Sequence, residues 1–338
     1  MPYLLAGDVG GTKTILALYA TDASSSRQTK PLREIAKTSF KSADYSDFND
    51  LLQDFLSTLT IDQEINACFG IAGPIIEQIC DATNLPWSID ALKIKNKFGF
   101  SKIKLINDLE AAAYGMTQLN SDDFVELNPD AKPQKGHCAV VAAGTGLGEA
   151  IMAWSGEQYN GEQYIVLPSE GGHCEFGAND QQEDELLKFL RQRFNGHVSI
   201  ERILSGDGFA NIYDFLRDSN FADSNPEIEQ KMQVADKNAI ISQHGLSGDD
   251  LLCQETLRLF VKIYGREAGN LCLKCLPKAG IYIGGGIAPK IIKQMQSGEF
   301  MAGFLDKGRM THAIKNIPVR LVLNTEAPLI GAAYIANN

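Results

Sequence analysis

The sequence contains no apolar run long enough to cross a bilayer, and no basic-then-apolar leader follows Met1. It also lacks a cluster of lysine and arginine, and its formal net charge is −11. Because a nucleic-acid backbone attracts concentrated positive charge, we do not expect nucleic acid as a partner. These absences predict a cytoplasmic protein that neither spans a membrane nor binds DNA or RNA.

Cysteine is scarce and scattered, with seven in 338 residues. An odd number cannot all pair within one chain, and their apolar surroundings predict reduced, mostly buried thiols. One close pair, Cys272 and Cys275, falls late in a helical pattern rather than after a strand. We therefore favour a packing role for this pair over redox or metal chemistry.

What is present is ordinary globular composition, with 44% hydrophobic and 22% charged residues, in a chain long enough for two domains. Strand-like and helical patterns alternate, which predicts an α/β architecture with two sheets. Strands are expected at 3–7, 14–20, 65–74, 102–108, 138–148, 279–286 and 319–324. Helices are expected at 45–59, 89–100, 109–116, 181–194, 201–218, 249–275 and 328–336, with Asp108 as the cap of the third.

An apolar strand ending in a glycine-rich turn occurs three times, at 10–11, 144–148 and 284–286. Without a Cβ in the way, backbone amides in such turns can approach an anion. None of the turns fits a common nucleotide motif. Thr12 replaces the second glycine of a P-loop, and Glu149 and Pro289 break the dinucleotide fingerprint in the later turns. A plain hairpin would explain any one of them.

Taken in order, however, Asp-x-Gly-Gly-Thr, Gly-Thr-Gly-x-Gly and Gly-Gly-Gly resemble the superfamily of sugar kinases, actin and heat-shock chaperones over nearly the whole chain. The resemblance implies a two-domain α/β, actin-like ATPase (ribonuclease H-like) fold with a cleft between the domains. Each domain would contribute one phosphate hairpin, and the third loop would lie against the adenosine.

Four segments narrow the resemblance to the bacterial-type glucokinase family: "LINDLEAAAYG" (105–115), "LPSEGGHCEF" (167–176), "GHVSIERILSGDG" (196–208) and "IYIGGGIAPK" (281–290). Membership would imply transfer of the γ-phosphoryl group of ATP, bound with Mg²⁺, to the 6-hydroxyl of D-glucose, and a homodimer. The related ROK proteins carry a zinc-binding Cys-x-Cys-Gly-x-x-Gly-Cys motif, whereas Cys174 stands alone here. No zinc is therefore expected.

Nucleotide contacts are assigned to the three loops. Asp8 would hold Mg²⁺ through its water shell, because magnesium keeps several waters and takes few protein carboxylates. Its alternative role is to cap the turn. A helix starting near Ala288 would add a positive dipole end. The assigned residues are Gly7, Asp8, Val9, Gly10, Gly11, Thr12, Gly144, Thr145, Gly146, Gly148, Gly284, Gly285 and Gly286.

The sugar site needs a base, because a primary alcohol is a poor nucleophile until its proton can leave. Asp108 is the candidate, and capping a helix is its alternative role. Asn107 beside it can donate to one sugar hydroxyl and accept from another. By resemblance, hydroxyls at the anomeric end would be held by Glu170, His173 and Glu201.

Three further residues lie in family-like segments. Asn84 resembles a position beside the sugar, while His197 and Glu175 are interpreted as structural. The polar stretch before residue 136 and the family's returning chain end predict a small domain of 1–117 plus 322–338 and a large one of 118–321.

Rival functions remain. A kinase for another hexose or an N-acetyl hexosamine would share the loops. A sugar-sensing repressor would need a DNA-binding headpiece, for which a first strand at residue 3 leaves no room. A chaperone or filament ATPase would not need the Asn-Asp and Glu-Gly-Gly-His pairs.

Overall fold

The computed structural model describes residues 2–21, 32–82, 85–159 and 162–338. The chain forms two compact units. The first comprises Met1–Ser121, Glu157–Val166 and Asn324–Asn338, and the second comprises Asp122–Gly156 and Leu167–Leu323. The units therefore part at 121/122 and 323/324, and a segment from the middle of the chain joins the first unit, a crossing that the sequence pattern did not predict.

The first unit is built on a five-stranded sheet in the order β3-β2-β1-β4-β7. Its strands are β1 (Tyr3–Val9), β2 (Lys13–Thr21), β3 (Leu32–Lys41), β4 (Ile65–Ile71) and β7 (Lys102–Asn107). Strand β1 is antiparallel to β2 and parallel to β4, which is parallel to β7. The carboxyl ends of β1, β4 and β7 therefore share one edge. Strand β3 was not expected from the sequence.

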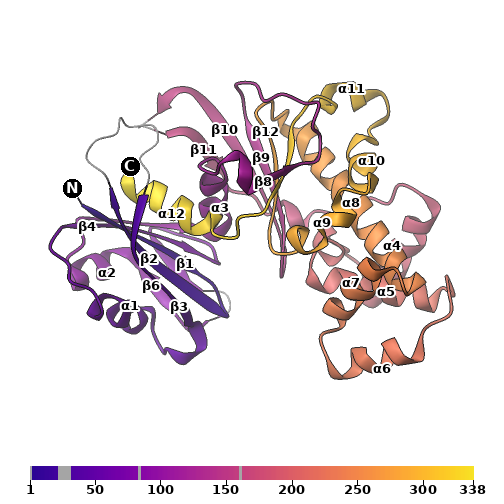
Figure 1. Ribbon diagram of the computed structural model, residues 1–338, viewed down its shortest axis with the longest axis horizontal. Coiled ribbons are helices and arrows are strands. Elements are labelled where there is room, and N and C mark those ends of the chain that lie inside the picture. Colours follow the sequence, from indigo (N-terminus) through magenta and orange to yellow (C-terminus); the bar gives the residue numbers. More distant parts are fainter. Residues whose placement is uncertain (1, 22–31, 83–84, 160–161) are drawn as a thin grey trace. The chain divides into compact units, whose positions relative to one another are not determined.

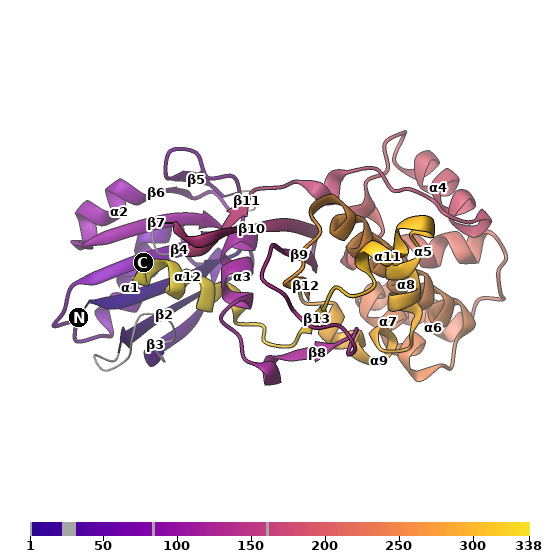
Figure 2. The same cartoon turned by 90° about the horizontal axis from the view of Figure 1, so that it is seen from above.

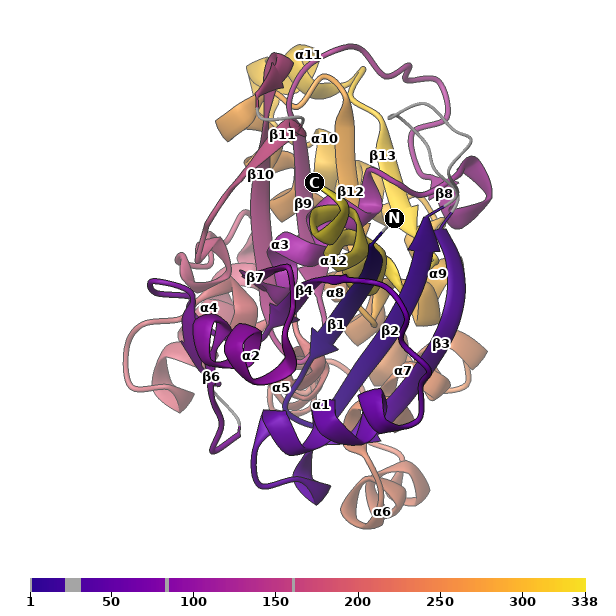
Figure 3. The same ribbon diagram turned by 90° about the vertical axis from the view of Figure 1, so that its left-hand side faces the viewer.

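Helices cover both faces of this sheet. Helices α1 (Phe48–Ser57) and α2 (Ala91–Phe98) pack on the face that carries Leu5 and Phe69. Helices α3 (Asp108–Met116) and α12 (Ala327–Asn337) lie on the other face, side by side (Figures 1 and 3). A small two-stranded sheet completes the unit, with β5 (Ile79–Asp81) and β6 (Ser88–Asp90).

Two glycines let α3 and α12 approach backbone to backbone. A Cβ on Gly115 would lie 1.8 Å from the carbonyl oxygen of Ala327, and one on Gly331 would lie 1.8 Å from that of Ala111. No side chain fits at such distances, so the chain's last helix fixes the position of α3. The amino end of α3 begins the candidate site.

The cap of α3 differs from the sequence prediction. Asn107, not Asp108, is the N-cap, and its Oδ1 accepts the N–H of Leu109 at 2.9 Å. Asp108 is the first helical residue, and its Oδ1 also accepts from Leu109, at 2.8 Å. The predicted cap was thus wrong by one residue, because β7 ends at Asn107 and not at residue 108, so the helix begins one residue earlier than predicted.

The second sheet repeats this topology (Figure 2), and it belongs to the second unit except for the end of β10 and most of β11. Strand order is β11-β10-β9-β12-β13-β8, with β9 antiparallel to β10, parallel to β12, and β12 parallel to β13. The bounds are β8 (Phe124–Glu126), β9 (Cys138–Ala143), β10 (Leu147–Tyr159), β11 (Glu162–Leu167), β12 (Gly280–Gly284) and β13 (Val319–Val322). In both units a glycine turn follows the first strand of the hairpin.

Helices α5, α7 and α10 of the second unit pack on α8, whose Phe260 and Tyr264 are fully buried, and α6 packs on α7. The helices of this unit are α4 (Gln181–Arg193), α5 (Gly206–Asp218), α6 (Pro226–Val234), α7 (Lys237–Ser247), α8 (Leu251–Cys275), α9 (Ile292–Met295), α10 (Glu299–Leu305) and α11 (Thr311–Ile314). Helices α6 and α7 were not predicted. The helix predicted at 201–218 is instead a 3-10 turn at Ile200–Arg202 followed by α5.

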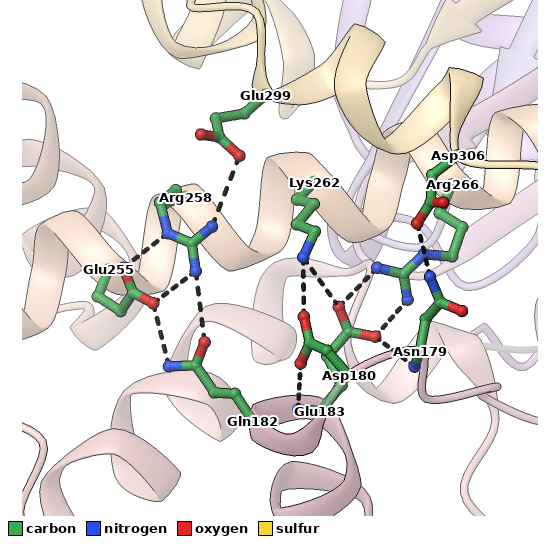
Figure 4. Close-up of polar contacts among 10 residues, drawn as sticks. All are labelled: Asn179, Asp180, Gln182, Glu183, Glu255, Arg258, Lys262, Arg266, Glu299 and Asp306. Carbon is green, nitrogen blue, oxygen red and sulfur yellow. Dashed lines mark hydrogen bonds and ion pairs between the residues drawn. The ribbon is translucent and has the colours of Figure 1, made fainter.

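A polar cluster joins α4 to α8 (Figure 4). The carboxylate of Glu183 is fully buried and forms a two-pronged ion pair with the guanidinium of Arg266. Beside it, Lys262 Nζ donates to Asp180 Oδ2 at 2.8 Å. A buried charge needs such pairing, because moving an unpaired charge out of water into the protein interior costs several kcal/mol.

All seven cysteines are free thiols, and five of them are buried. Burial raises the pKa of Cys272 well above its ordinary value, which makes this thiol unreactive. Cys272 and Cys275 lie near the end of α8, as predicted, while Cys174 is exposed. Among the described residues, no helix combines the length and apolar character that a bilayer crossing requires.

Candidate active site

The first glycine hairpin is a tight turn between β1 and β2. The N–H of Gly10 donates to the carbonyl of Lys13 at 3.1 Å and closes the turn. Ser42 braces it, because its hydroxyl donates to the carbonyl of Gly10 at 2.7 Å and lies 3.0 Å from Thr14 Oγ1. Thr12 at the tip is exposed. Ser42 is fully buried, and nothing in its local sequence signalled this bracing role.

Asp8 lies next to the last residue of β1, opposite Gly70 of β4. Burial, followed by the nearby charge of Asp108, raises the pKa of Asp8 to about 6, and Lys13 opposes the shift. The two carboxylates therefore share one neighbourhood at the carboxyl edge of the sheet. Gly7 and Val9, also assigned to the nucleotide, occupy buried positions within β1.

Gly70 is the reason that α3 can begin so close to β4. A Cβ on Gly70 would lie 2.8 Å from the Cβ of Ala111 and 3.6 Å from the Cα of Asp108. The sequence pattern did not single out this glycine. Asn107 is held at the same edge, since its side-chain amide donates to the carbonyl of Gly73 at 3.3 Å.

The second glycine hairpin, Gly144–Gly148, is tied to Glu201. The N–H of Gly144 donates to the carbonyl of Gly146 at 2.8 Å, and the N–H of Leu147 donates to Glu201 Oε2 at 2.9 Å. A Cβ on Gly146 would lie 2.6 Å from the same carboxylate oxygen. Glycine at 146 therefore lets a carboxylate rest against the hairpin.

The structure brings together three residues that the sequence assigned to one site. His173 Nδ1 lies 3.8 Å from Glu201 Oε1, and His173 Nε2 lies 3.8 Å from Glu170 Oε2. The side chain of Glu201 is 27% exposed and that of Glu170 is 90% exposed, so the group extends from a half-buried carboxylate to one that is open to solvent. These polar groups can bind several hydroxyls at once.

Backbone contacts fix the loop that carries His173. His197 Nε2 lies 3.1 Å from the carbonyl oxygen of His173, and Glu175 forms an isolated β-bridge with Ser199. These contacts agree with the structural roles that the sequence suggested for His197 and Glu175. The loop is thereby anchored to the segment that leads to Glu201.

The third loop, Gly284–Gly286, packs against the end of β9. Gly285 has φ +82°, and a Cβ there would lie 2.1 Å from the carbonyl oxygen of Ala143. Only glycine combines that backbone conformation with that approach. The helix predicted near Ala288 is a four-residue 3-10 turn, Ala288–Ile291, so the dipole it can offer is small.

Tyr264 of α8 links the two glycine loops of this unit. Its buried hydroxyl accepts the N–H of Ala143 at 3.1 Å and lies 3.2 Å from the carbonyl oxygens of both Val141 and Gly284. The residues before the hairpin and at the start of the third loop are therefore held by one side chain. A tyrosine within a helical pattern carried no signal of this role in the sequence.

We expect the Tyr264→Phe variant to lose about 1–3 kcal/mol of unfolding free energy, because the buried N–H of Ala143 would lose its partner. Urea unfolding followed by circular dichroism measures the loss. Tyr45→Phe is the matched control, since the Tyr45 hydroxyl bonds Asp54 in an exposed position. Equal stability of the two variants would contradict the linking role of Tyr264.

Two further expectations from the sequence concern Asn84 and the binding of a metal ion. Asn84 lies outside the described residues. Among the residues that are described, no group of three or more histidine, cysteine, aspartate and glutamate side chains could enclose a metal ion.

Two α/β units of one topology, each with a glycine hairpin after its first strand, define the actin-like class of sugar kinases. The crystal structure of a glucokinase from an Antarctic psychrotroph superposes with TM-score 0.84 at 30% identity, over 100% of both chains. A ROK-family glucokinase from Streptomyces griseus, solved with glucose and AMPPNP, shares the fold with TM-score 0.64 at 17% identity, over 99% of both chains.

Sequence comparison is more specific. The family model described as Glucokinase matches residues 5–338. The glucokinase of Nostoc sp. (strain PCC 7120) is 40% identical over 99% of both chains, and that of Synechocystis sp. is 39% identical over 98% of this chain and 97% of its own. The chain belongs to the glucokinase family.

Proposed function

We propose that this chain transfers the γ-phosphoryl group of ATP to the 6-hydroxyl of D-glucose, giving glucose 6-phosphate and ADP, with Asp108 as the general base. The observation that carries the proposal is the position of Asp108 at the carboxyl edge of the first sheet, beside Asp8 and the first glycine hairpin. Phosphoryl transfer depends mainly on positioning and charge neutralisation. The hairpin and the carboxylates at this edge can position the reacting groups, and a cation bound there would supply the positive charge.

The base acts on the attacking alcohol. In the proposed reaction, Asp108 accepts the proton of the 6-hydroxyl as the oxygen bonds to the γ-phosphorus and the bond to the β-phosphate oxygen breaks. A carboxylate within hydrogen-bond reach contributes typically about 10²–10⁴-fold. Because Asp108 is the first residue of α3, packing of α12 against that helix fixes its position.

The same edge fits Mg²⁺. Asp8 and Asp108 are oxygen donors of like charge, and their repulsion contributes to the raised pKa of Asp8, so a cation would relieve it. We propose that Asp8 holds the ion through water. Bound there, Mg²⁺ would neutralise charge on the β- and γ-phosphate oxygens.

The glycine loops serve the nucleotide in this proposal. Backbone amides of Gly11 and Thr12 would face the terminal phosphates, while Gly10 shapes the turn, because its N–H already donates to Lys13. The hairpin 144–148 of the second unit would contact phosphates through amides other than those of Gly144 and Leu147, which already donate within the protein. Gly284, Gly285 and Gly286 would let purine and ribose lie against the backbone.

We propose that Glu170, His173 and Glu201 accept and donate hydrogen bonds at the anomeric end of the sugar, and that Asn107 binds near the reacting hydroxyl. Specificity would follow, since a missing or inverted hydroxyl leaves a polar partner unpaired. The 3.8 Å spacing of His173 from both glutamates supports joint binding.

A sugar panel tests the proposal and its alternative, a kinase for another hexose or an N-acetyl hexosamine. With ATP and Mg²⁺ in a coupled ADP assay, we expect kcat/KM for glucose to exceed that for mannose and N-acetylglucosamine by about tenfold or more. A higher kcat/KM for another sugar would favour the alternative. If no sugar of the panel led to ADP formation, the proposed glucose kinase activity and the alternative would both be rejected.

We further propose a cytoplasmic homodimer. Seven free cysteines suit a reducing compartment. Light scattering coupled to gel filtration tests the assembly, and the measured molar mass should be twice the 36.9 kDa mass of one chain.

A further inference from the structure

Two buried carboxyl groups of the second unit interact with each other, and one of them, Glu149, lies against the loop of Glu170 and His173. Glu149, on β10, is 1% exposed, and Glu267, on α8, is 8% exposed. Glu149 Oε1 has no hydrogen-bond partner among the described residues. An orphaned oxygen on a buried acid is costly, so its retention calls for a physical reason.

Glu149 rests directly against the loop. A Cβ on Gly171 would lie 2.3 Å from Glu149 Oε2, and one on Gly172 would lie 2.1 Å from the carbonyl oxygen of Leu147. The two glycines between Glu170 and His173 therefore let the loop sit on the first residues of β10. Leu147 also donates its N–H to Glu201, so one strand contacts both Glu201 and the two glycines between Glu170 and His173.

The charges that face this pair come mostly from α8. Burial, and then the charge of Glu267, raise the pKa of Glu149 to about 7, while Lys274 opposes the shift. Lys274 Nζ lies 3.9 Å from Glu267 Oε1, and Asn270 Nδ2 donates to Glu267 Oε2 at 3.0 Å. The other titratable groups facing the pair are Tyr264, Cys275 and Lys307.

We propose that Glu149 is a positioning residue for the Glu170–His173 loop. The neutral Glu149 carboxyl holds the loop in place, and ionisation of Glu149 weakens sugar binding. The inference deepens the proposed function and rests on it. In the neutral form the Glu149 carboxyl can donate a hydrogen bond to Glu267. After ionisation, two buried negative charges repel each other against the backbone of Gly171.

The pH dependence follows from the direction of the pKa shift. The pKa of Glu149 rises from 4.5 to about 7 on folding, so the folded chain binds the extra proton between these values. This contribution to stability is present at low pH and is lost as pH rises through about 7. The KM for glucose should rise over the same range, as the charged pair disturbs the loop.

Steady-state kinetics of Glu149→Gln test the inference, because an amide keeps the shape and cannot ionise. In the unmodified chain we expect the KM for glucose to rise about three- to tenfold from pH 6 to pH 8, and in the variant less than about twofold. The KM for ATP should show no such difference between the two. Glu185→Gln, an exposed site on α4, is the control and should follow the unmodified chain. A Glu149→Gln profile that matches the unmodified chain would overturn the inference.

A second measurement needs no activity. Between pH 5 and pH 7, the unfolding free energy of the unmodified chain should fall relative to that of Glu149→Gln in urea titrations. If Glu149→Gln does not fold, Glu267→Gln replaces it and should reduce the same pH dependence, since it removes the repelling charge and leaves only burial to raise the pKa of Glu149. A parallel pH dependence in the variant and unmodified chains would reject the ionising pair. Absence of glucose phosphorylation at every pH would instead reject the proposed function.

Discussion

We expect the Asp108→Asn variant to phosphorylate glucose about 10²–10⁴-fold more slowly than the unmodified chain, because the amide cannot accept the proton of the attacking hydroxyl. The KM for glucose should stay within about tenfold, since a hydrogen-bonding group of the same size remains. The fold should also survive. The Oδ1 of an asparagine can still accept the N–H of Leu109, and Asn107 supplies the helix cap independently.

Coupled ADP release measures the two constants. Glu110→Gln is the matched control, because it removes a carboxylate from the same helix two residues later and should keep kcat within about twofold. A kcat for Asp108→Asn close to that of the control would remove Asp108 from the reaction. A large rise in KM with unchanged kcat would make Asp108 a binding residue instead.

The second large effect concerns stability and the cluster in Figure 4. We expect Glu183→Leu to lower the unfolding free energy by about 3–5 kcal/mol, because the guanidinium of Arg266 would stay buried without its partner. Lys262, which lies 3.8 Å from Glu183, would lose a second contact. The loss should appear as a lower urea midpoint with a similar slope.

Two comparisons separate this pairing from a general effect of leucine on α4. Glu185→Leu replaces an exposed acid paired with Lys188 and should cost about 1 kcal/mol or less. The double variant Glu183→Leu, Arg266→Met should recover much of the loss, since paired apolar residues can replace a buried ion pair. A single variant as stable as Glu185→Leu would mean that the pair contributes little.

Much of the candidate site could be predicted from local sequence. The three glycine turns follow their strands as expected, and Glu170, His173 and Glu201 lie together although 31 positions separate the first from the last. Family resemblance supplied that grouping, and periodicity alone did not. Helix α8 and strand β9 were predicted because their apolar patterns are long and regular.

Other features depended on distant partners. Strand β3 was not predicted because it pairs only with β2 at the sheet's edge and its residues alternate weakly. The cap passed from Asp108 to Asn107 because pairing with β4 ends at Asn107, so that β7 is one residue shorter and α3 begins one residue earlier than predicted. Helices α6 and α7 carry few buried residues, so their patterns were faint.

The sequence by itself determined the alternation of strands and helices, the glycine turns and the acids beside them, because backbone freedom and apolar periodicity are local properties. Only the tertiary structure decided that Ser42 braces the first hairpin, that Tyr264 joins the later loops, and that Glu149 is buried against Gly171. Each of those contacts joins segments far apart in the chain, and burial strengthens the hydrogen bonds and charge interactions that the side chains make. Hydrogen bonds and charges acquire their strength from the surroundings that folding provides.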